Sequence, residues 1–359
     1  MAFIDDLRVY RDKLRFRIYK ALYDYKAVKS GNDFNFSSIQ HIVISKIDGK
    51  LGDTQVMTPF FANIKKHYPH IKISVITLAN VKDIYEQCIG VDTTLIAPQK
   101  RPSKAQVLAM AEKIGVNGKC DLFIFLDEVV RPREFYMLHY LKPDYVAATA
   151  KGLDCVNIPI SIDYSRHMSQ ALNSLLSLGG IKDIDDSYIS FASDLLISKY
   201  REVFKGSKVI GFTPYGAMSC KNITQKMQEQ MLDYILEHTD YKIVMLLAPS
   251  AVNYKHKIET KLGDRCIALP DHITVIELSS VIACLDALVS VDTANVHIAG
   301  AFDIPLFSLH PSKANITLWG PHHAMTHSVK FSKEGVYISD LCYADIKEDF
   351  EAFIDRYCR

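Results

Sequence analysis

The feature that most constrains the fold is a series of short apolar runs separated by longer segments with helical periodicity. The runs in the first half of the chain are 41–47, 72–77, 121–126 and 144–149. The runs in the second half are 208–213, 242–248, 286–291 and 305–309. Those of the second half are almost continuously apolar, as strands are when helices cover both faces of a sheet. Alternating strands and helices predict parallel sheets, so we expect two similar α/β halves.

The length of the chain also indicates two domains. Its 359 residues exceed what one hydrophobic core usually fills. The segment 178–187 is rich in Gly and Asp and poor in apolar residues, so we place the hinge there. We therefore predict an N-terminal domain over 1–180 and a C-terminal domain over 181–359. The last stretch fits an amphipathic helix, which either packs on its own domain or crosses back to the first.

Composition limits the class of protein and its partners. Hydrophobic residues make up 48% of the chain and charged residues 23%, which is typical of a soluble globular protein. The formal net charge of +1 provides no general attraction to nucleic acid, so we expect no nucleic-acid partner. The eight cysteines are scattered without a C-x-x-C pair. With no signal-like segment and no apolar run near the ~20 residues that span a bilayer, the predicted location is the cytoplasm.

The N-terminus has the pattern of one long amphipathic helix, with apolar residues at steps of three and four. These residues are Phe3, Leu7, Tyr10, Leu14, Ile18, Leu22 and Tyr25. Residues 1–30 contain eight Lys or Arg against four Asp, a local net charge of +4. Two interpretations remain open. The helix either packs on the first domain with a solvated outer face or docks on an anionic surface, the cytoplasmic face of the inner membrane.

The loop that follows the first strand contains the first candidate site. In an open α/β sheet the carboxyl ends of the strands face the ligand crevice, so the loop with Gly49, Gly52 and Asp53 should line it. The glycines permit tight turns close to a ligand. Their spacing is not G-x-G-x-x-G, which counts against a dinucleotide oxidoreductase. Asp53 either caps the helix that begins there or acts on the ligand.

A second candidate site is the segment 290–297, where a strand runs into a helix. The amino end of a helix attracts anions, so a nucleotide diphosphate can rest against Thr293 and Ala294. His297 lies four residues after Thr293 and shares its helix face. The alternative is that Asp292 or Thr293 only caps the helix and that His297 is a hydrogen-bonded crevice residue.

A third candidate site is the loop 214–221, which leaves the first strand of its domain and contains Gly216 and Lys221. Lys221 can neutralise a phosphate, or it is an ordinary solvated lysine. Four histidines near the C-terminus have spacings that fit no metal-binding motif: His310, His322, His323 and His327. We therefore expect no metal and no cofactor.

Together and in this order, these loops resemble those of the heptosyltransferases, glycosyltransferase family 9. The segment 41–69 resembles the opening strand, Leu-Gly-Asp and helix of that family, and 289–312 resembles its V-S-x-D-T-G-x-x-H-x-A-x-A signature. Trp319-Gly320-Pro321 resembles its Gly-Pro turn. The resemblance covers about residues 41 to 325 and leaves out the N-terminal helix. It implies the GT-B fold, in which two Rossmann-like domains have parallel sheets facing a central cleft.

The resemblance also implies roles for particular residues. Asp53 matches the catalytic base and Lys221 the lysine that contacts the donor phosphates. The positions that match the start of the donor-binding helix are Asp292, Thr293, Ala294 and His297. The implied reaction is an inverting, metal-independent transfer of heptose from ADP-heptose to a lipopolysaccharide inner-core acceptor of the Kdo-lipid A type in a Gram-negative bacterium.

The sequence departs from the family pattern around the donor. Ala294 replaces the usual Gly, and the segments 221–224 and 309–312 differ from their family counterparts. Two alternatives therefore stay open. One is a related glycosyltransferase that uses another nucleotide sugar or a capsule acceptor, and the other is a non-catalytic protein that binds nucleotide sugars.

Overall fold

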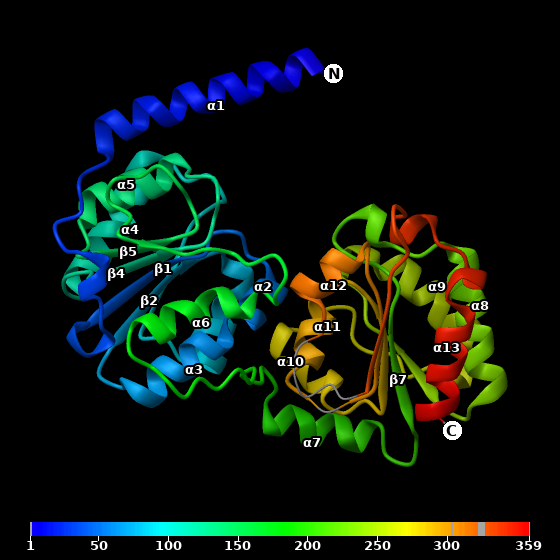
Figure 1. Cartoon of the computed structure of the whole chain (residues 1–359). Coiled ribbons are helices and arrows are strands. Elements are labelled where there is room, and N and C mark those ends of the chain that lie inside the picture. Colours follow the sequence, from blue (N-terminus) through cyan, green and yellow to red (C-terminus); the bar gives the residue numbers. More distant parts are fainter. Residues whose placement is uncertain (1, 303, 322–326, 359) are drawn as a thin grey trace. The chain divides into compact units, whose positions relative to one another are not determined.

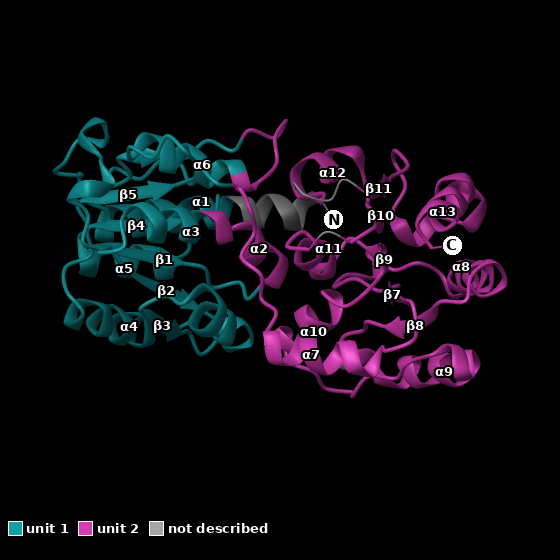
Figure 2. Ribbon diagram, turned by 90° about the horizontal axis from the view of Figure 1, so that it is seen from below, with its two compact units in different colours: residues 1–49, 60–162, 170–185 teal, residues 50–59, 163–169, 186–359 magenta. Residues whose placement is uncertain are grey.

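The computed structural model describes the whole chain except residues 1, 303, 322–326 and 359, and at 2–9 and 249 it describes the backbone alone. The chain divides into two compact units (Figure 2). The first comprises residues 1–49, 60–162 and 170–185, and the second comprises 50–59, 163–169 and 186–359. The main change of unit, at 185/186, falls within the Gly- and Asp-rich segment. The assignment of 50–59 to the second unit was not predicted from the sequence.

The first unit contains a parallel sheet whose described strands follow the order β3-β2-β1-β4-β5-β6. The strands are β1 (His41–Ser45), β2 (Lys72–Thr77), β3 (Thr93–Ile96), β4 (Leu122–Phe125), β5 (Tyr145–Ala148) and β6 (Ile158–Pro159). Ile42 lies beside Ile73 of β2 on one side and Leu122 of β4 on the other. This order is that of a Rossmann sheet. Successive strands are added toward one edge from β1 to β3 and toward the other edge from β4 to β6, so the strand order reverses between β1 and β4.

Helices cover both faces of this sheet (Figure 1). They are α3 (Thr58–His67), α4 (Lys104–Val116), α5 (Pro132–Leu141) and α6 (Ser169–Leu178). On the face under α4 and α5, Val43 and Phe123 of the sheet are buried with Ile114 and Leu138 of the helices. A capping box between Ser103 and Gln106 starts α4 by satisfying backbone N–H groups that have no partner within the helix. Because helices cover both faces, all four residues of β4 and of β5 are buried.

The predicted N-terminal helix is present as α1 (Ala2–Tyr23), but a different face packs on the domain. Phe16, Tyr19 and Tyr23 contact the aromatic side chains of Phe135 and Tyr136 on α5. Of the predicted apolar row, Tyr25 packs against the domain core. Four other members are exposed, with fractions of 68% for Tyr10, 47% for Leu14, 49% for Ile18 and 62% for Leu22. Phe3 and Leu7, which the same pattern included, have side chains outside the described part. Aromatic pairing with α5 decides which face is buried.

The second unit contains another parallel sheet, with the described strands in the order β11-β10-β9-β7-β8. The strands are β7 (Val209–Thr213), β8 (Lys242–Met245), β9 (Ala287–Val291), β10 (Leu306–Leu309) and β11 (Ser328–Phe331). Numbered in chain order within this unit, the strands form a 2-1-3-4-5 sheet, and the strand order reverses between β7 and β9. The predicted α/β class with two parallel sheets is therefore confirmed.

The helices of the second unit surround this sheet. They are α2 (Leu51–Val56), α7 (Asp194–Val203), α8 (Gln225–His238), α9 (Val252–Leu262), α10 (Val275–Ile282), α11 (Ala294–Ala299), α12 (Lys313–Trp319) and α13 (Tyr343–Tyr357). The terminal helix α13 buries Ile346, Phe350 and Phe353 in the core of the second unit, where Phe350 and Phe353 contact Phe307. Within the described ranges, no helix has the length and apolar character needed to cross a bilayer.

Candidate functional site

The topology of the second unit places a candidate ligand site at the carboxyl ends of β7 and β9. These strands end at Thr213 and Val291, and the strand order of the sheet reverses between them. Ligands of open α/β sheets bind outside the strand ends at this point, because the loops there diverge and leave a crevice. The predicted residues Gly216, Lys221 and Asp292 all follow these two strands. The argument from topology thus selects the same loops as the sequence did.

Lys221 and Asp292 form an ion pair at this point. The Lys221 Nζ lies 2.5 Å from Asp292 Oδ2, and the carboxylate is buried with 6% of its side chain exposed. The backbone N–H of Gly216 donates to Asn222 Oδ1 at 2.9 Å, which ties the loop into a turn. A Cβ atom on Gly216 would lie 2.8 Å from the Cβ of Lys221, so glycine is needed for this turn. Lys221 is therefore not an ordinary solvated lysine.

Thr293 caps the helix that follows β9. Its Oγ1 accepts a hydrogen bond from the backbone N–H of Asn295 at 3.3 Å, so Thr293 and not Asp292 is the N-cap of α11. The Asn295 side chain donates to Thr213 Oγ1 at 2.9 Å and so connects the helix to the end of β7. Ala294 is the first residue of the helix. The helix start and the Lys221 ammonium therefore lie at the same edge of the sheet.

His297 lies inside the second unit and is 5% exposed. Its ring meets that of Trp319 edge to face, with centroids 6.3 Å apart. Burial lowers the pKa of His297 to about 4, although the carboxylates of Asp292 and Asp53 oppose this shift. Its Nδ1 has no hydrogen-bond partner among the described residues. His297 is therefore neutral near pH 7, and it is not the fully hydrogen-bonded histidine of the alternative interpretation.

The short helix α2 packs against α11 within the second unit. A Cβ atom on Gly52 would lie 2.7 Å from His297 Cδ2 and 3.5 Å from Ala294 Cα, so only glycine allows this approach. Gln55 Nε2 donates to the carbonyl of Ile189 at 2.8 Å, which also attaches α2 to this unit. Gly52 thus acts in helix packing, a role the sequence did not reveal.

Asp53 is the third residue of α2, and the N-cap position belongs to Lys50. The interpretation of Asp53 as the helix cap is therefore wrong. Its carboxylate is partly exposed and lies 3.7 Å from Lys50 Nζ. Gly49, by contrast, belongs to the first unit and has a φ of 63°, a left-handed conformation that favours glycine. Asn80 Nδ2 donates to the Gly49 carbonyl at 2.7 Å, which fixes the turn before α2.

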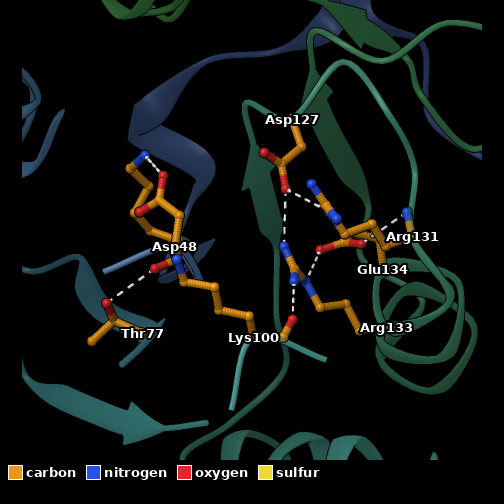
Figure 3. Close-up of polar contacts among 8 residues, drawn as sticks. Asp48, Thr77, Lys100, Asp127, Arg131, Arg133 and Glu134 are labelled. Atoms are coloured by element: carbon orange, nitrogen blue, oxygen red, sulfur yellow. Dashed lines mark hydrogen bonds and ion pairs between the residues drawn. The ribbon is translucent and has the colours of Figure 1, made fainter. Parts of the chain in front are cut away.

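The reversal point of the first unit carries a group of charged residues that the sequence did not single out (Figure 3). Lys46 and Asp48 follow β1 and form an ion pair of 2.5 Å. Thr77, at the end of β2, donates to the Lys46 carbonyl at 3.0 Å. Asp48 sits just beyond the predicted strand 41–47 and Lys46 lies at its end, so the argument from strand ends that identified Asp53 could have found them.

A second part of this charged group follows β4. Arg133 is buried and donates to Glu134 Oε1 at 2.6 Å, to Asp127 Oδ2 at 2.9 Å and to the Lys100 carbonyl at 2.5 Å. Arg131 is more exposed, and its Nε lies 3.6 Å from the same Asp127 oxygen (Figure 3). The buried arginine thus holds two loops and the start of α5 in place, while Asp127 and Arg131 remain accessible at the edge.

His310, considered above only as a metal ligand, has a structural role. It is buried and makes hydrogen bonds with Asn315 Oδ1 at 3.0 Å and Ser308 Oγ at 2.9 Å. Burial lowers the pKa of His310. His322 and His323 lie outside the described residues. Over the described part of the chain, no group of three His, Cys, Asp or Glu side chains could hold a metal ion.

Two α/β units with parallel sheets, each with its candidate residues at a reversal of strand order, define the GT-B class of fold. Residues 184–334 match the family described as Glycosyltransferase family 9 (heptosyltransferase), and the resemblance expected from the sequence is thereby confirmed. Nearly all of the matched residues belong to the second unit. Among curated proteins, no sequence matches the chain.

Solved structures show how far the similarity extends. A glycosyl transferase family 9 protein from Veillonella parvula DSM 2008 is 18% identical, with a TM-score of 0.75 over 90% of this chain and 99% of that one. ADP-heptose lps heptosyltransferase II from E. coli is 16% identical, with a TM-score of 0.67 over 89% and 99%. E. coli heptosyltransferase WaaC, solved with ADP, is 15% identical, with a TM-score of 0.67 over 87% and 99%. At these identities the shared property is the fold.

Proposed function

We propose that this protein is an inverting, metal-independent glycosyltransferase that moves heptose from ADP-heptose to a lipopolysaccharide inner-core acceptor. The observation that carries the proposal is the meeting of the Lys221–Asp292 ion pair with the Thr293-capped helix at the reversal point of a family 9 domain. Such an arrangement suits a diphosphate, because it combines a positive side chain with the N–H groups at a helix start.

The donor diphosphate takes its place between Lys221 and the backbone N–H groups at Thr293 and Ala294. Lys221 keeps its contact with Asp292, which fixes the position of the ammonium group before the donor arrives. As the bond between the anomeric carbon and the diphosphate oxygen breaks, negative charge grows on the departing nucleotide diphosphate. Preorganised donors stabilise this charge without reorganisation, which is the largest contribution available to a site without a metal.

Asp53 acts as the general base. It takes the proton of the acceptor hydroxyl while that oxygen attacks the anomeric carbon from the side opposite the diphosphate, so the configuration inverts. A positioned base typically contributes ~10²–10⁴ in rate. Support comes from the packing of α2 on α11, since Gly52 and His297 are in contact and Asp53 influences the His297 ring electrostatically. The base and the donor-binding helix are thus held in one compact unit.

The acceptor binds at the carboxyl edge of the first unit. Lys46 and Arg131 supply positive charge there, and Asp48 and Asp127 supply hydrogen-bond acceptors for sugar hydroxyls. Because such an acceptor is attached to lipid, the protein works in peripheral contact with the cytoplasmic face of the inner membrane. The second candidate function is transfer from another nucleotide sugar or to a capsule acceptor. It is favoured by the differences from the family pattern at Ala294 and 309–312.

The test is an assay of purified protein with ADP-heptose, UDP-sugars and GDP-sugars side by side, using wild type and Asp53→Asn. We expect transfer from ADP-heptose alone, and we expect the variant to bind ADP with wild-type affinity but to transfer at least ~10²-fold more slowly. Preference for another donor would select the second candidate. Normal transfer by the variant would remove Asp53 from the mechanism, and absence of transfer by the wild type from every donor would favour a non-catalytic binding protein.

A further inference from the structure

Helix α1 has two apolar faces, of which the domain uses one. The inner face is attached to α5 by rings, with centroids 5.8 Å apart for Phe16 and Phe135 and 5.0 Å apart for Tyr23 and Tyr136. Lys20 Nζ adds an ion pair of 2.7 Å with Asp154. Figure 1 shows α1 beside α5 at the outer side of the first unit. Within its described side chains, the helix is therefore attached to the fold through this inner face.

The outer face carries a continuous apolar row. Tyr10, Leu14, Ile18 and Leu22 follow one another at intervals of four residues, and 47% to 68% of each is exposed. At 1.5 Å per residue the row is ~18 Å long. At 100° per residue it lies roughly opposite the aromatic face that contacts α5. We call these four residues the outer row. Contact with α5 cannot cover it, because the inner face already occupies that helix.

Basic side chains border the outer row on both sides. By the same helical geometry, Lys13 and Arg17 lie along one side and Arg11 and Arg15 along the other, and all four are exposed. The backbone position of the acidic Asp12 falls on the opposite side of the helix, and its exposed carboxylate pairs with Arg11 at 2.9 Å. An apolar row between two basic rows is the pattern of a helix that lies in the plane of an anionic bilayer surface, with its apolar side chains among the acyl chains and its cations at the headgroups.

We propose that α1 docks the protein on an anionic lipid surface through the outer row and its two basic borders. Charge decides between this occupant and a second copy of the chain. Residues 1–30 carry a net charge of +4, so two such helices repel one another, whereas anionic headgroups attract them. Since the inner face stays on α5, docking needs no unfolding. This proposal deepens the peripheral membrane contact of the proposed function, but it involves none of the candidate site residues. Loss of vesicle binding and loss of sugar transfer can therefore be told apart.

The experiment is flotation of the full-length protein with phosphatidylcholine vesicles, with and without phosphatidylglycerol. We expect binding only to vesicles that contain phosphatidylglycerol, and weaker binding as salt is raised. The variant Leu14→Ser, Ile18→Ser, Leu22→Ser should bind at least ~10-fold more weakly because the apolar contribution is lost. In the variant Arg11→Gln, Lys13→Gln, the affinity for these vesicles should fall roughly fivefold for each charge removed.

A matched control removes exposed apolar side chains elsewhere. Val116 is 83% exposed and Leu195 is 79% exposed, and neither lies on α1, so Val116→Ser, Leu195→Ser should bind vesicles as the wild type does. Melting temperature and ADP binding, unchanged in all variants, verify the fold. Equal binding of wild type to both kinds of vesicle, or wild-type binding by the outer-row variant, would overturn the proposal. A wild-type dimer that the outer-row variant converts to monomer, with vesicle binding unchanged, would overturn it in favour of a second copy.

Discussion

The contact between α2 and α11 can be tested by adding a single methyl group. In Gly52→Ala the new Cβ would lie 2.7 Å from His297 Cδ2, closer than carbon atoms approach without displacement. His297 cannot move away easily, because it is buried and its ring contacts Trp319. Overpacking of this kind costs about 1–3 kcal/mol. Alanine regains ~1 kcal/mol over glycine through its helix propensity, so the expected net loss is roughly 1 kcal/mol.

Gly115→Ala is the matched control for this prediction. Gly115 lies in the last turn of α4, and a Cβ there would meet no atom within 4 Å. The control should therefore stabilise the protein by up to ~1 kcal/mol, whereas Gly52→Ala should destabilise it. A loss of 1 kcal/mol lowers the melting temperature by ~2–4 °C in a unit of this size. Because α2 is displaced together with Asp53, we also expect a fall in kcat. Parallel stabilisation of both variants, with kcat unchanged, would refute the close packing of these helices.

Three further predictions concern ionisable side chains. Lys221→Met should weaken ADP binding roughly 10–100-fold by calorimetry, because it removes a charged contact and leaves Asp292 unpaired; unchanged affinity would contradict its role. Since the pKa of His297 is lowered to about 4 from 6.5, the unfolded chain binds more protons between these values, and stability should fall as pH drops from 6.5 toward 4. His297→Gln should lessen this fall in denaturant unfolding, and parallel pH curves would argue against the buried neutral ring. Arg133→Met leaves Glu134 as an uncompensated buried charge and should lower the free energy of unfolding by ~3–5 kcal/mol. The double variant Arg133→Met, Glu134→Gln should lower it by less, and equal losses would show that the pair is not coupled.

The strands that the sequence predicted are those buried on both faces. Runs such as 122–125 and 287–291 contain few polar residues, because helices pack against both sides of the sheet. The strands that were missed lie toward the sheet edges. β3 begins with two threonines, and β6 has only two residues. In β11 burial is incomplete, so an apolar run is not required there.

The N-terminal helix shows a limit of periodicity. Its apolar residues predicted the helix correctly, but they did not indicate which face packs on the domain. Tyr19 and Tyr23 carry hydroxyl groups and were not part of the regular row through Leu14 and Ile18, yet their rings match those on α5. Which of two apolar faces packs depends on the shape of the partner helix, and that information lies in residues more than a hundred positions away.

The candidate site was predictable where it follows from strand ends and not where it depends on distant pairing. Gly216, Lys221 and Asp292 follow strands whose carboxyl ends are visible in the sequence. That Lys221 pairs with Asp292 could not be inferred, because they lie 71 residues apart and loop lysines are usually solvated. The same limit applies to Gly52. That this position must be glycine becomes apparent only when α11 is placed against it.

The assignment of α2 to the second unit has a consequence for how the protein is made. This helix leaves the ribosome directly after β1, long before α11, against which it packs, has been synthesised. The packing of α2 against α11 is therefore missing while the first unit emerges. The second unit reaches its final packing only late in translation, and a fragment expressed from residue 186 onward would lack the helix that carries Asp53.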